Sequence, residues 1–244
     1  MNQKIYLDYA ATTPVAEPFL DAMLPYFTQI FGNSSSVHRF GQQAEAALEM
    51  ARESIAKGLN CQPKEVIFTS CGSESDNLAL RGVAFAARKE RNARHILISP
   101  VEHDAISRTA EQLAQQHRFE LEYLPVDEFG MVSVQDLASR IRPDTALVSI
   151  IYANNEIGTI NPIAEIGKIC RSHGIPLHTD AVQAAGYLPT DVEALQVDLL
   201  SLGAHKFYGP KGVGALYIRQ GTPIISAQTG GEQEFGLRAG THNT

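Results

Sequence analysis

The sequence lacks the features of several protein classes. No apolar run approaches the roughly 20 residues of a membrane helix. The first residues contain no apolar core of a signal peptide. Acidic residues outnumber basic ones by 27 to 20, which argues against nucleic acid as the main partner. The sequence therefore predicts a soluble, cytoplasmic protein that binds neither nucleic acid nor a membrane.

Cysteine is also scarce. The chain has three cysteines, Cys61, Cys71 and Cys170, an odd number without the paired spacing of a metal site. They are predicted to be reduced thiols rather than a disulfide framework. No P-loop pattern and no GxGxxG fingerprint occurs, so a nucleotide ligand is not indicated.

Short apolar runs alternate with helical patterns over most of the chain. The predicted strands span residues 65–69, 95–99, 121–124, 146–151, 175–179, 198–202 and 213–218. The predicted helices span residues 42–59, 74–88, 105–117, 133–140, 163–173 and 181–185. Strands that alternate with helices imply crossover units and a mostly parallel sheet, so the predicted fold class is α/β. Ligands of such sheets bind beyond the carboxyl ends of the strands, where the candidate residues are found.

A lysine stands directly after the apolar run 197–202 and before a glycine–proline turn. Lys206 at the end of a buried strand is costly unless it has a function, because burial disfavours the charged amine. The same burial lowers the pKa of a lysine, as a nucleophilic amine requires. The alternative is a surface lysine in a turn.

Residues 69–76 follow a predicted strand and open a predicted helix. Gly72 allows a ligand to approach the backbone, Ser73 offers a hydroxyl, and the start of the helix offers free N–H groups. Together these features suit a phosphate. The alternative is an ordinary helix start with Ser73 as its N-cap.

Two further polar positions follow strands. His103 is suited to stack on a flat aromatic ligand or to transfer a proton, and the alternative is a local hydrogen bond at a helix start. Asn155 follows the strand 146–151, where an asparagine either forms a turn or points its amide at a ligand oxygen.

Asp180 and Gln183 follow the predicted strand 175–179. Asp180 lies where a carboxylate can pair with a protonated ring nitrogen. Gln183, about one turn further on, is placed to donate a hydrogen bond to a ring oxygen. The alternative for Asp180 is the N-cap of the helix predicted at 181–185.

Together these positions are the parts that a pyridoxal 5'-phosphate (PLP) enzyme requires. Lys206 is the Schiff-base lysine and Asp180 the partner of the pyridine nitrogen, while Gly72 and Ser73 form the phosphate cradle and His103 stacks on the ring. The sequence therefore predicts PLP as the cofactor.

A metal hydrolase is the other chemistry that these positions allow. His103, His178, Asp180 and His205 are reasonable zinc ligands by residue type. The sequence has no HxxxH-type helix pair, however, so no metal site is predicted.

Eight segments, in order along the chain, resemble the cysteine desulfurases of the NifS/IscS type, in the class V aminotransferase group of fold-type I PLP enzymes. The matching segments are residues 6–14, 31–33, 69–77, 102–103, 153–158, 180–183, 204–214 and the Arg-Ala-Gly-Thr run 238–241. They cover nearly the whole chain, and their combined specificity is high.

The resemblance implies a role for each matching position. Lys206 and His103 are implied as the catalytic residues, Lys206 attaching the cofactor and His103 stacking on the ring and moving protons. The other implied cofactor-binding positions are Asp180 for the pyridinium, Gln183 for the phenolic oxygen, Asn155 for the ring or the substrate carboxylate, and Gly72, Ser73 and His205 for the phosphate, with Thr241 reaching over from the partner subunit.

The resemblance also implies an activity. Enzymes of this kind are transferases that convert L-cysteine to L-alanine and pass the sulfur, as an enzyme persulfide, to iron–sulfur cluster or thiocofactor synthesis. They are homodimers, and an iron–sulfur scaffold or sulfur-acceptor protein is the implied partner. Selenocysteine lyases and other class V PLP enzymes share every motif and stay open as alternatives, as does a non-catalytic large domain that acts as a binding or interaction protein.

The implied architecture is a three-layer α/β large domain of fold type I, with a mostly parallel sheet, over residues 16–244. Residues 1–15 normally join a C-terminal small domain. We expect that small domain to be missing from this chain, together with the persulfide-carrying cysteine and a substrate-binding arginine that the family places downstream of Thr241. Residues 1–15 are therefore expected to be poorly supported unless they dock elsewhere.

The chain departs from the family pattern at several positions. Gly203 stands where the family usually has a serine that bonds the phosphate, and losing one such bond costs about 1.5–3 kcal/mol. Glu232 and Phe235 replace a glycine and an arginine common in that loop. Cys71 lies beside the predicted phosphate cradle, and we interpret it as a structural substitution for a small residue rather than as the sulfur nucleophile.

Overall fold

The computed structural model describes residues 5–244, so the first four residues of the predicted N-terminal segment 1–15 lie outside the described part. Seven strands form one sheet in the order β1-β7-β6-β5-β4-β2-β3. The strands are β1 (Val66–Thr69), β2 (His95–Ile98), β3 (Glu120–Tyr123), β4 (Thr145–Ser149), β5 (Leu177–Asp180), β6 (Leu199–Gly203) and β7 (Gly214–Ile218). Each coincides with a predicted strand to within about two residues, the accuracy at which such boundaries are defined.

The sheet is mostly parallel. Strands β3, β2, β4, β5 and β6 pair in parallel, whereas β7 is antiparallel to both β6 and β1. Since β1 and β6 both oppose β7, they run in the same direction. The carboxyl ends of β1, β2, β4, β5 and β6 therefore meet at one edge of the sheet.

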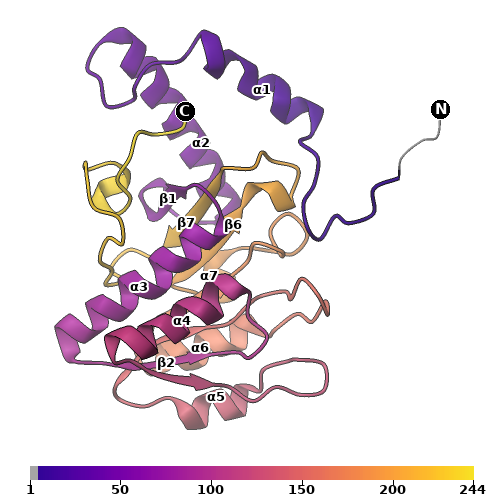
Figure 1. Ribbon diagram of the computed structural model, residues 1–244, viewed down its shortest axis with the longest axis vertical. Helices are drawn as coiled ribbons and strands as arrows, with labels where there is room; N and C mark the ends of the chain where they lie inside the picture. The colour runs from indigo at the N-terminus through magenta and orange to yellow at the C-terminus, as the bar shows by residue number, and fades with distance from the viewer. Residues whose placement is uncertain (1–4) are drawn as a thin grey trace.

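Helices connect and cover these strands (Figure 1). They are α1 (Glu17–Thr28), α2 (Arg39–Leu59), α3 (Gly72–Arg91), α4 (Asp104–His117), α5 (Val134–Arg140), α6 (Ile163–Ser172) and α7 (Val192–Leu195), with short 3-10 turns η1 (Pro63–Glu65), η2 (Ala204–Lys206) and η3 (Glu234–Gly236). Five of the six predicted helices occur within these bounds. Helix α1 and the one-turn α7 were not predicted.

Alternating side chains of each strand enter two separate hydrophobic cores. Ile96 and Ile98 of β2 pack with residues of α3 and α4, whereas Leu97 between them packs with residues of α2, α5, α6 and α7. Both faces of the sheet are thus apolar, as expected for buried parallel strands. The result is three layers, helix–sheet–helix, which confirms the predicted α/β fold class.

The helix predicted at 181–185 is wrong. Residues 182–187 form successive turns instead, with the N–H of Ala185 donating to the carbonyl of Ala181 and the N–H of Leu188 to that of Ala184. Gly186 has a φ of +82°, in the left-handed region that a helix cannot continue through. The segment therefore turns back under the edge of the sheet.

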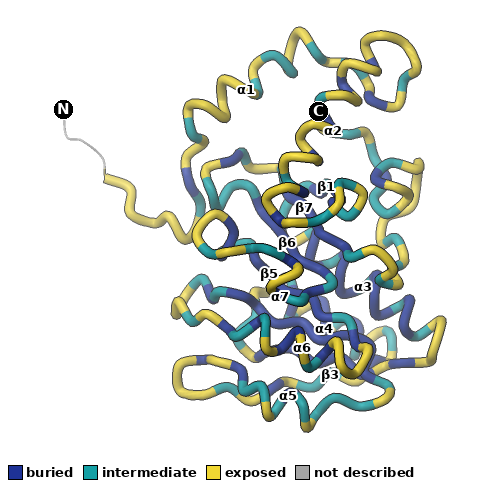
Figure 2. The backbone as a smooth tube through the Cα atoms, turned by 180° about the vertical axis from the view of Figure 1, so that it is seen from behind, coloured by how far each residue is buried: buried dark blue, intermediate teal, exposed yellow. Residues whose placement is uncertain are grey.

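The N-terminal region contrasts with the buried sheet (Figure 2). Helix α1 has no buried residue, and its Leu24 and Phe27 are 54% and 68% exposed. In the described part of the chain, no helix combines the length and the apolar character that a membrane crossing needs.

Candidate active site

Residues at the ends of four strands gather at the carboxyl edge of the sheet. Lys206 follows β6, Asp180 ends β5, His103 lies beyond β2, and Gly72 opens α3 just after β1. The charges of Lys206 and His103 both act on the Asp180 carboxyl, which places the three groups close together. The edge therefore brings together an amine, an imidazole and a buried carboxyl, as the sequence predicts.

Lys206 lies at the end of η2, directly after β6. Burial lowers the pKa of its amine, and the carboxylates of Asp180 and Asp8 raise it in part. Its Nζ donates a hydrogen bond to the carbonyl oxygen of Ala10. A lysine with a lowered pKa is a better nucleophile at neutral pH, because a larger share of it is the free amine.

The N-terminal segment docks on the lysine turn through a few contacts. Thr13 is 3% exposed. Its N–H and its hydroxyl both donate to the carbonyl of His205, and its Oγ1 accepts the N–H of Tyr208. Residues 5–11 before it are exposed. The segment thus docks at Thr13, while residues 5–11 are exposed, which agrees with the expectation of poor support for this part of the N-terminal segment.

Asp180 is 5% exposed and ends β5. Its Oδ1 accepts the N–H of Val182 at 2.8 Å. This is the kind of local hydrogen bond that an N-cap makes, but no helix follows Asp180, so Asp180 is not an N-cap. Burial raises the pKa of the carboxyl, while that hydrogen bond and the charges of His103 and Lys206 lower it. A carboxylate in this setting is suited to hold a cationic ring nitrogen, since a buried charge needs an opposite charge beside it.

Gln183 and Asn155 line one side of the site. The Oε1 of Gln183 is buried and has no hydrogen-bond partner among residues 5–244. Both residues border an open pocket of about 430 Å³ between the loop after β4 and the turns after β5. Asn154, by contrast, uses its amide locally, accepting from the N–H groups of Glu156 and Ile157. Asn155 rather than Asn154 is therefore available to a ligand.

His103 is the N-cap of α4, and its Nδ1 accepts the N–H of Ala105 at 3.1 Å. The predicted local hydrogen bond therefore exists and engages one ring nitrogen, while the residue itself is exposed. His178 is different, because its two ring nitrogens contact the hydroxyls of Ser149 and Ser201 at 2.9 Å each. Burial lowers the pKa of His178 to about 3, so it is a neutral residue of the core.

The predicted phosphate cradle is the start of α3. Cys71, not Ser73, is the N-cap, and it makes no side-chain cap bond. The alternative role of Ser73 as N-cap is therefore wrong, because the helix begins at Gly72, two residues earlier than that role requires. The N–H groups of Gly72 and Ser73 lie in the first turn and have no intrahelical partner, which leaves them available to an anion.

Val182 explains the glycines on both sides of the cradle. A Cβ at Gly72 would lie 2.5 Å from Val182 Cγ2, and a Cβ at Gly203 would lie 3.1 Å from Val182 Cγ1. The same Cβ at Gly203 would lie 3.5 Å from the nitrogen of Gly72. A serine at 203 would thus stand next to the cradle, but it would press against Val182.

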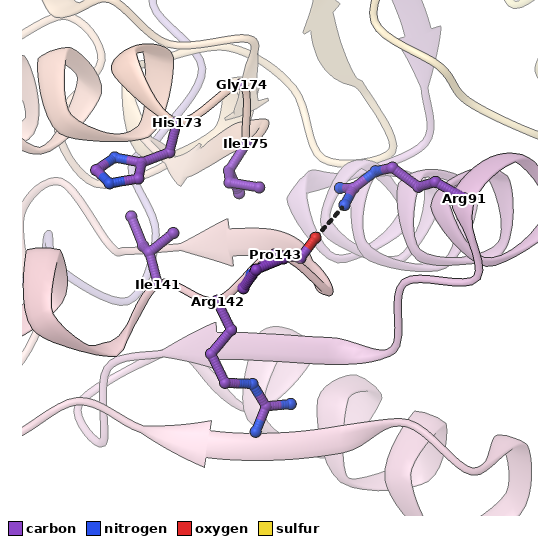
Figure 3. A pocket seen from close by; sticks show the side chains of 7 residues that line it. All are labelled: Arg91, Ile141, Arg142, Pro143, His173, Gly174 and Ile175. Atoms are coloured by element: carbon purple, nitrogen blue, oxygen red, sulfur yellow. Dashed lines mark hydrogen bonds between the residues drawn. The ribbon is translucent and has the colours of Figure 1, made fainter.

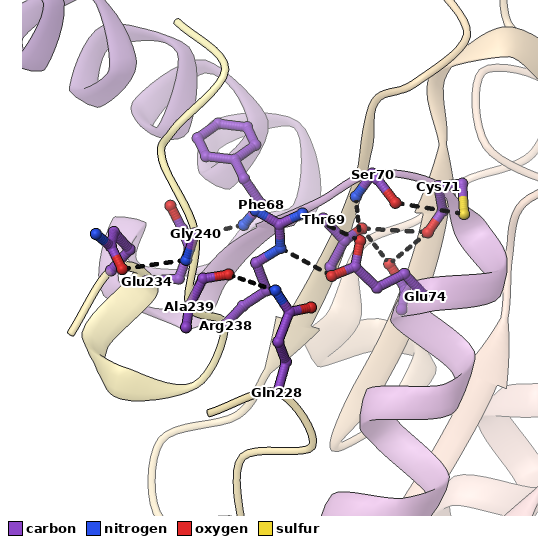
Figure 4. Close-up of polar contacts among 12 residues, drawn as sticks. Phe68, Thr69, Ser70, Cys71, Glu74, Gln228, Glu234, Arg238, Ala239 and Gly240 are labelled. Carbon is purple, nitrogen blue, oxygen red and sulfur yellow. Dashed lines mark hydrogen bonds and ion pairs between the residues drawn. The ribbon is translucent and has the colours of Figure 1, made fainter. Parts of the chain in front are cut away.

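The segment carrying Thr241 is tied to the cradle by ion pairs (Figure 4). Arg238 Nε donates to Glu74 Oε1 at 2.8 Å, and Glu74 Oε2 accepts the N–H of Ser70 at 2.6 Å. Further back, the buried Glu234 pairs with Arg52 of α2 at 2.8 Å. The loop 230–241 is therefore anchored at two points, and Thr241 lies just beyond them.

Two buried carboxyls near the site were not among the predicted residues. They belong to Glu102 and Asp76, and the charge of Asp180 raises the pKa of both. Ser99 donates its hydroxyl to Glu102 Oε1. Glu102 lay inside a matching segment, next to His103, and this was the one signal for it in the sequence.

The three cysteines are free thiols. Burial raises the pKa of Cys61 and of Cys170 to about 12. Neither is a ready nucleophile, since the thiolate is the reactive form. Cys71 lies at the cradle end of the site, as expected.

A second pocket, of about 320 Å³, lies at the opposite edge of the sheet (Figure 3). Arg91, Arg142 and His173 line it. Arg91 donates to the carbonyls of Pro143 and Thr145, and Arg142 pairs with Glu120 and Asp144. Its charged groups are already paired within the chain, and it contains none of the predicted site residues.

Comparison with known proteins agrees with this geometry. The family model described as Aminotransferase class-V matches residues 5–244. The chain belongs to this family. Class V aminotransferases depend on PLP, as the resemblance implied.

Relatives within the class V family are named cysteine desulfurases. Cysteine desulfurase IscS of Clostridium botulinum (strain Hall) is 51% identical over 244 residues, all of this chain and 61% of its own length. Cysteine desulfurase IscS of Dictyoglomus turgidum is 52% identical over 243 residues, with the same coverage. The chain thus spans about three fifths of the length of these curated relatives.

Solved structures of class V relatives share the fold. A NifS-like protein superimposes with a TM-score of 0.94 at 42% identity, covering 99% of this chain and 66% of the other. SspA in complex with cysteine also has a TM-score of 0.94 at 42% identity, covering 98% of this chain and 69% of the other. These matches confirm the predicted resemblance and the fold-type I large domain.

The residues at the edge of the sheet fit PLP. The Oε1 of Gln183 is buried without a hydrogen-bond partner among residues 5–244, so no described residue holds the side-chain amide through this atom, and its Nε2 would donate to the phenolic oxygen. The second oxygen of Asp180 has no hydrogen-bond partner among residues 5–244, since only Oδ1 is bonded. The free N–H groups of Gly72 and Ser73 suit the phosphate, and the amine of Lys206 suits the aldehyde.

Proposed function

We propose that this chain is the cofactor-binding part of a PLP-dependent cysteine desulfurase. The observation that carries the proposal is the grouping of Lys206, Asp180 and His103 at one sheet edge, beside the free N–H groups of α3. The names of the relatives support the choice of activity. The proposed substrate is L-cysteine, and the similar SspA structure is a complex with cysteine.

Each group has a proposed part in the reaction. When bound, PLP supplies an electron sink that lets bonds of an amino acid break. Lys206 would provide the attachment point of the cofactor, and the Asp180 carboxylate would hold the protonated ring nitrogen and so keep that electron sink strong. His103, whose Nδ1 accepts the N–H of Ala105, would have its Nε2 left to move a proton.

The other predicted residues would orient the cofactor. Gln183 and Asn155 border the pocket on the ring side and would contact the phenolic oxygen and the substrate carboxylate. Gly72, Ser73 and His205 would hold the phosphate. Thr241 would reach the phosphate of a partner subunit, which makes a homodimer part of this proposal.

The sulfur-accepting thiol is proposed to come from outside these 244 residues. Cys61 and Cys170 have raised pKa values, and Cys71 lies at the phosphate end of the site rather than at the substrate end. An iron–sulfur scaffold or another sulfur acceptor would then receive the sulfur. We place the protein in the cytoplasm because its three free thiols suit a reducing compartment.

The attachment of PLP is tested by borohydride reduction followed by peptide mass mapping. We expect a pyridoxyl label on Lys206 and none in Lys206→Ala. Lys211, five residues further on in the same turn region, is the matched control, and Lys211→Ala should keep the label at 206. A label elsewhere, or no label, refutes the proposal.

The substrate is tested with the same protein. L-cysteine should change the visible absorption of the bound cofactor, and this change should persist when Cys61, Cys71 and Cys170 are all replaced by serine. Parallel titration with L-selenocysteine separates the desulfurase from a selenocysteine lyase. Without an added thiol, neither the parent nor the triple variant should release alanine and sulfide. Release of both products by the triple variant alone in solution would show that no cysteine thiol is needed, and the proposed source of the thiol would then be wrong.

A further inference from the structure

Glu102 joins two strand ends beneath the site. It lies in the loop between β2 and α4, just before His103. Its Oε1 accepts the hydroxyl of Ser99 at 2.6 Å and the N–H of Ile151, beyond β4, at 2.7 Å. One carboxyl oxygen thus fastens the loop that carries His103 to the segment that leads to Asn155.

The other oxygen of Glu102 has a different environment. Oε2 is buried and has no hydrogen-bond partner among residues 5–244. Both partners of Oε1 are neutral groups, a hydroxyl and a backbone amide. An ionised carboxylate is strongly disfavoured in such a place, because nothing compensates the loss of its hydration.

Two more carboxyls share this buried space. Asp180 acts electrostatically on both Glu102 and Asp76, and Glu102 acts on Asp76. Oδ1 of Asp76 is also buried without a hydrogen-bond partner among the described residues, although the neutral His178 lies 3.7 Å away. Carboxyls that crowd together cannot all be ionised, so some of them must hold protons.

The surrounding charges decide which one stays ionised. The charged groups that act on this cluster are His103 at the start of α4 and Lys206 on η2, and both act on Asp180. Asp180 also accepts a backbone N–H. Burial, the largest effect, raises the pKa of Glu102 to about 8 and that of Asp76 well above its ordinary value.

We infer that Glu102 is a positioning residue that acts as a neutral carboxyl, joining the ends of β2 and β4 and leaving Asp180 as the ionised carboxylate beneath the site. This role rests on the proposed function, because a charged Asp180 is required only if the site holds the ring nitrogen of PLP. Glu102 itself need not contact the cofactor.

The inference predicts that glutamine replaces Glu102 well. The Oε1 of a glutamine can accept both hydrogen bonds, and its amide is neutral at every pH. Glu102→Asp keeps an acid but is shorter, so it cannot reach Ser99 and Ile151 together. Glu102→Gln should bind PLP within about threefold of the parent, and Glu102→Asp should lose about tenfold, the equivalent of one hydrogen bond.

The protonation state of Glu102 is tested by measuring how the unfolding constant of the cofactor-free chain depends on pH. If folded Glu102 keeps its proton, the folded chain binds more protons than the unfolded chain between about pH 5 and the folded pKa of about 8. The parent therefore becomes less stable as pH rises through this window. Relative to Glu102→Gln, its unfolding constant in urea should rise by about tenfold per pH unit.

The control variant changes a glutamate that is not buried. Glu128→Gln, an exposed position in a turn, should follow the parent at every pH. The inference is overturned if the ratio of the unfolding constants of the parent and Glu102→Gln does not change with pH. It is also overturned if Glu102→Gln binds PLP as poorly as Glu102→Ala. If the parent takes up no pyridoxyl label, the proposed function fails, while the unfolding ratio still decides whether Glu102 holds a proton.

Discussion

The sheet body, residues 66–218, and the N-terminal region, residues 5–31, use large apolar side chains in opposite ways. Leu147 on β4 is 0% exposed and lies between the sheet and α3, whereas Leu24 and Phe27 on α1 are 54% and 68% exposed. The sheet body is therefore a complete hydrophobic core. None of the apolar side chains of α1 is buried within the described residues, as expected for a helix that completes its packing against another surface.

The same contrast separates the two ends of the proposed site. Asp180 and Glu102 at the ring end are held by a strand end and by buried hydrogen bonds of the sheet body. The phosphate end depends in addition on segments from outside the sheet body, Thr13 from the N-terminal region and Arg238 from the C-terminal loop. The phosphate end therefore depends on more separate segments of the chain than the ring end does.

The largest expected effect comes from the buried ion pair that ties α2 to the loop 230–241. Arg52→Met should destabilise the chain by about 3–5 kcal/mol, because it removes the arginine from the buried Glu234 carboxylate and leaves it only the N–H of Phe68 and the imidazole of His242. Urea unfolding measures this. Glu49→Gln, which removes the half-exposed partner of the same arginine, should cost no more than about 1 kcal/mol. If the two variants lowered the free energy of unfolding equally, burial of the ion pair would not explain its contribution to stability.

The next prediction compares the two regions directly. Leu147→Ala should cost about 2–5 kcal/mol, since it leaves a cavity between β4 and α3. Leu24→Ala should change stability by less than about 0.5 kcal/mol, because the side chain is half exposed. Thermal or urea unfolding of the two variants measures the two losses of stability. A large effect at Leu24 would mean that a second copy already covers α1 under the conditions of the measurement.

The pattern of apolar residues along the sequence determined which elements of the fold could be predicted. The strands were found because each is an apolar run, and helices α2 to α6 because each buries one apolar stripe against the sheet. Helix α1 has no such stripe against this chain, and Pro25 lies inside it, so its pattern gave no signal. The false helix at 181–185 has helix-forming residues, but Gly186 and the packing of Val182 against two glycines impose turns.

The site was predictable where residues follow strands. Lys206, Asp180 and His103 were placed correctly at the edge of the sheet because parallel topology brings carboxyl ends together. The burial of Glu102 and Asp76 was not predictable, since it depends on how close three different elements come. Contacts such as Thr13 with His205, which are 192 residues apart, leave no local pattern at all.

A smaller effect is expected at the phosphate end of the sheet body. Gly203→Ser should tighten PLP binding by about tenfold, because a hydroxyl beside the N–H of Gly72 adds one bond to the phosphate. Gly203→Ala adds the Cβ without the hydroxyl and is the matched control. Binding is measured by absorption titration. If the serine variant binds no tighter than the alanine variant, contact with Val182 has displaced the cradle, and Gly203→Ser with Val182→Ala should restore the gain.

The smallest effect tests the link between the two regions. Thr13→Val keeps the shape of the side chain but removes the hydroxyl that donates to His205 and accepts the N–H of Tyr208. We expect a loss of about 1 kcal/mol and faster amide exchange at Tyr208. Thr28→Val, at the exposed end of α1, should change neither quantity. Unaltered exchange at Tyr208 would show that the lysine turn holds its shape without the N-terminal segment. Faster exchange together with weaker PLP binding would show that Thr13 keeps Lys206 in place.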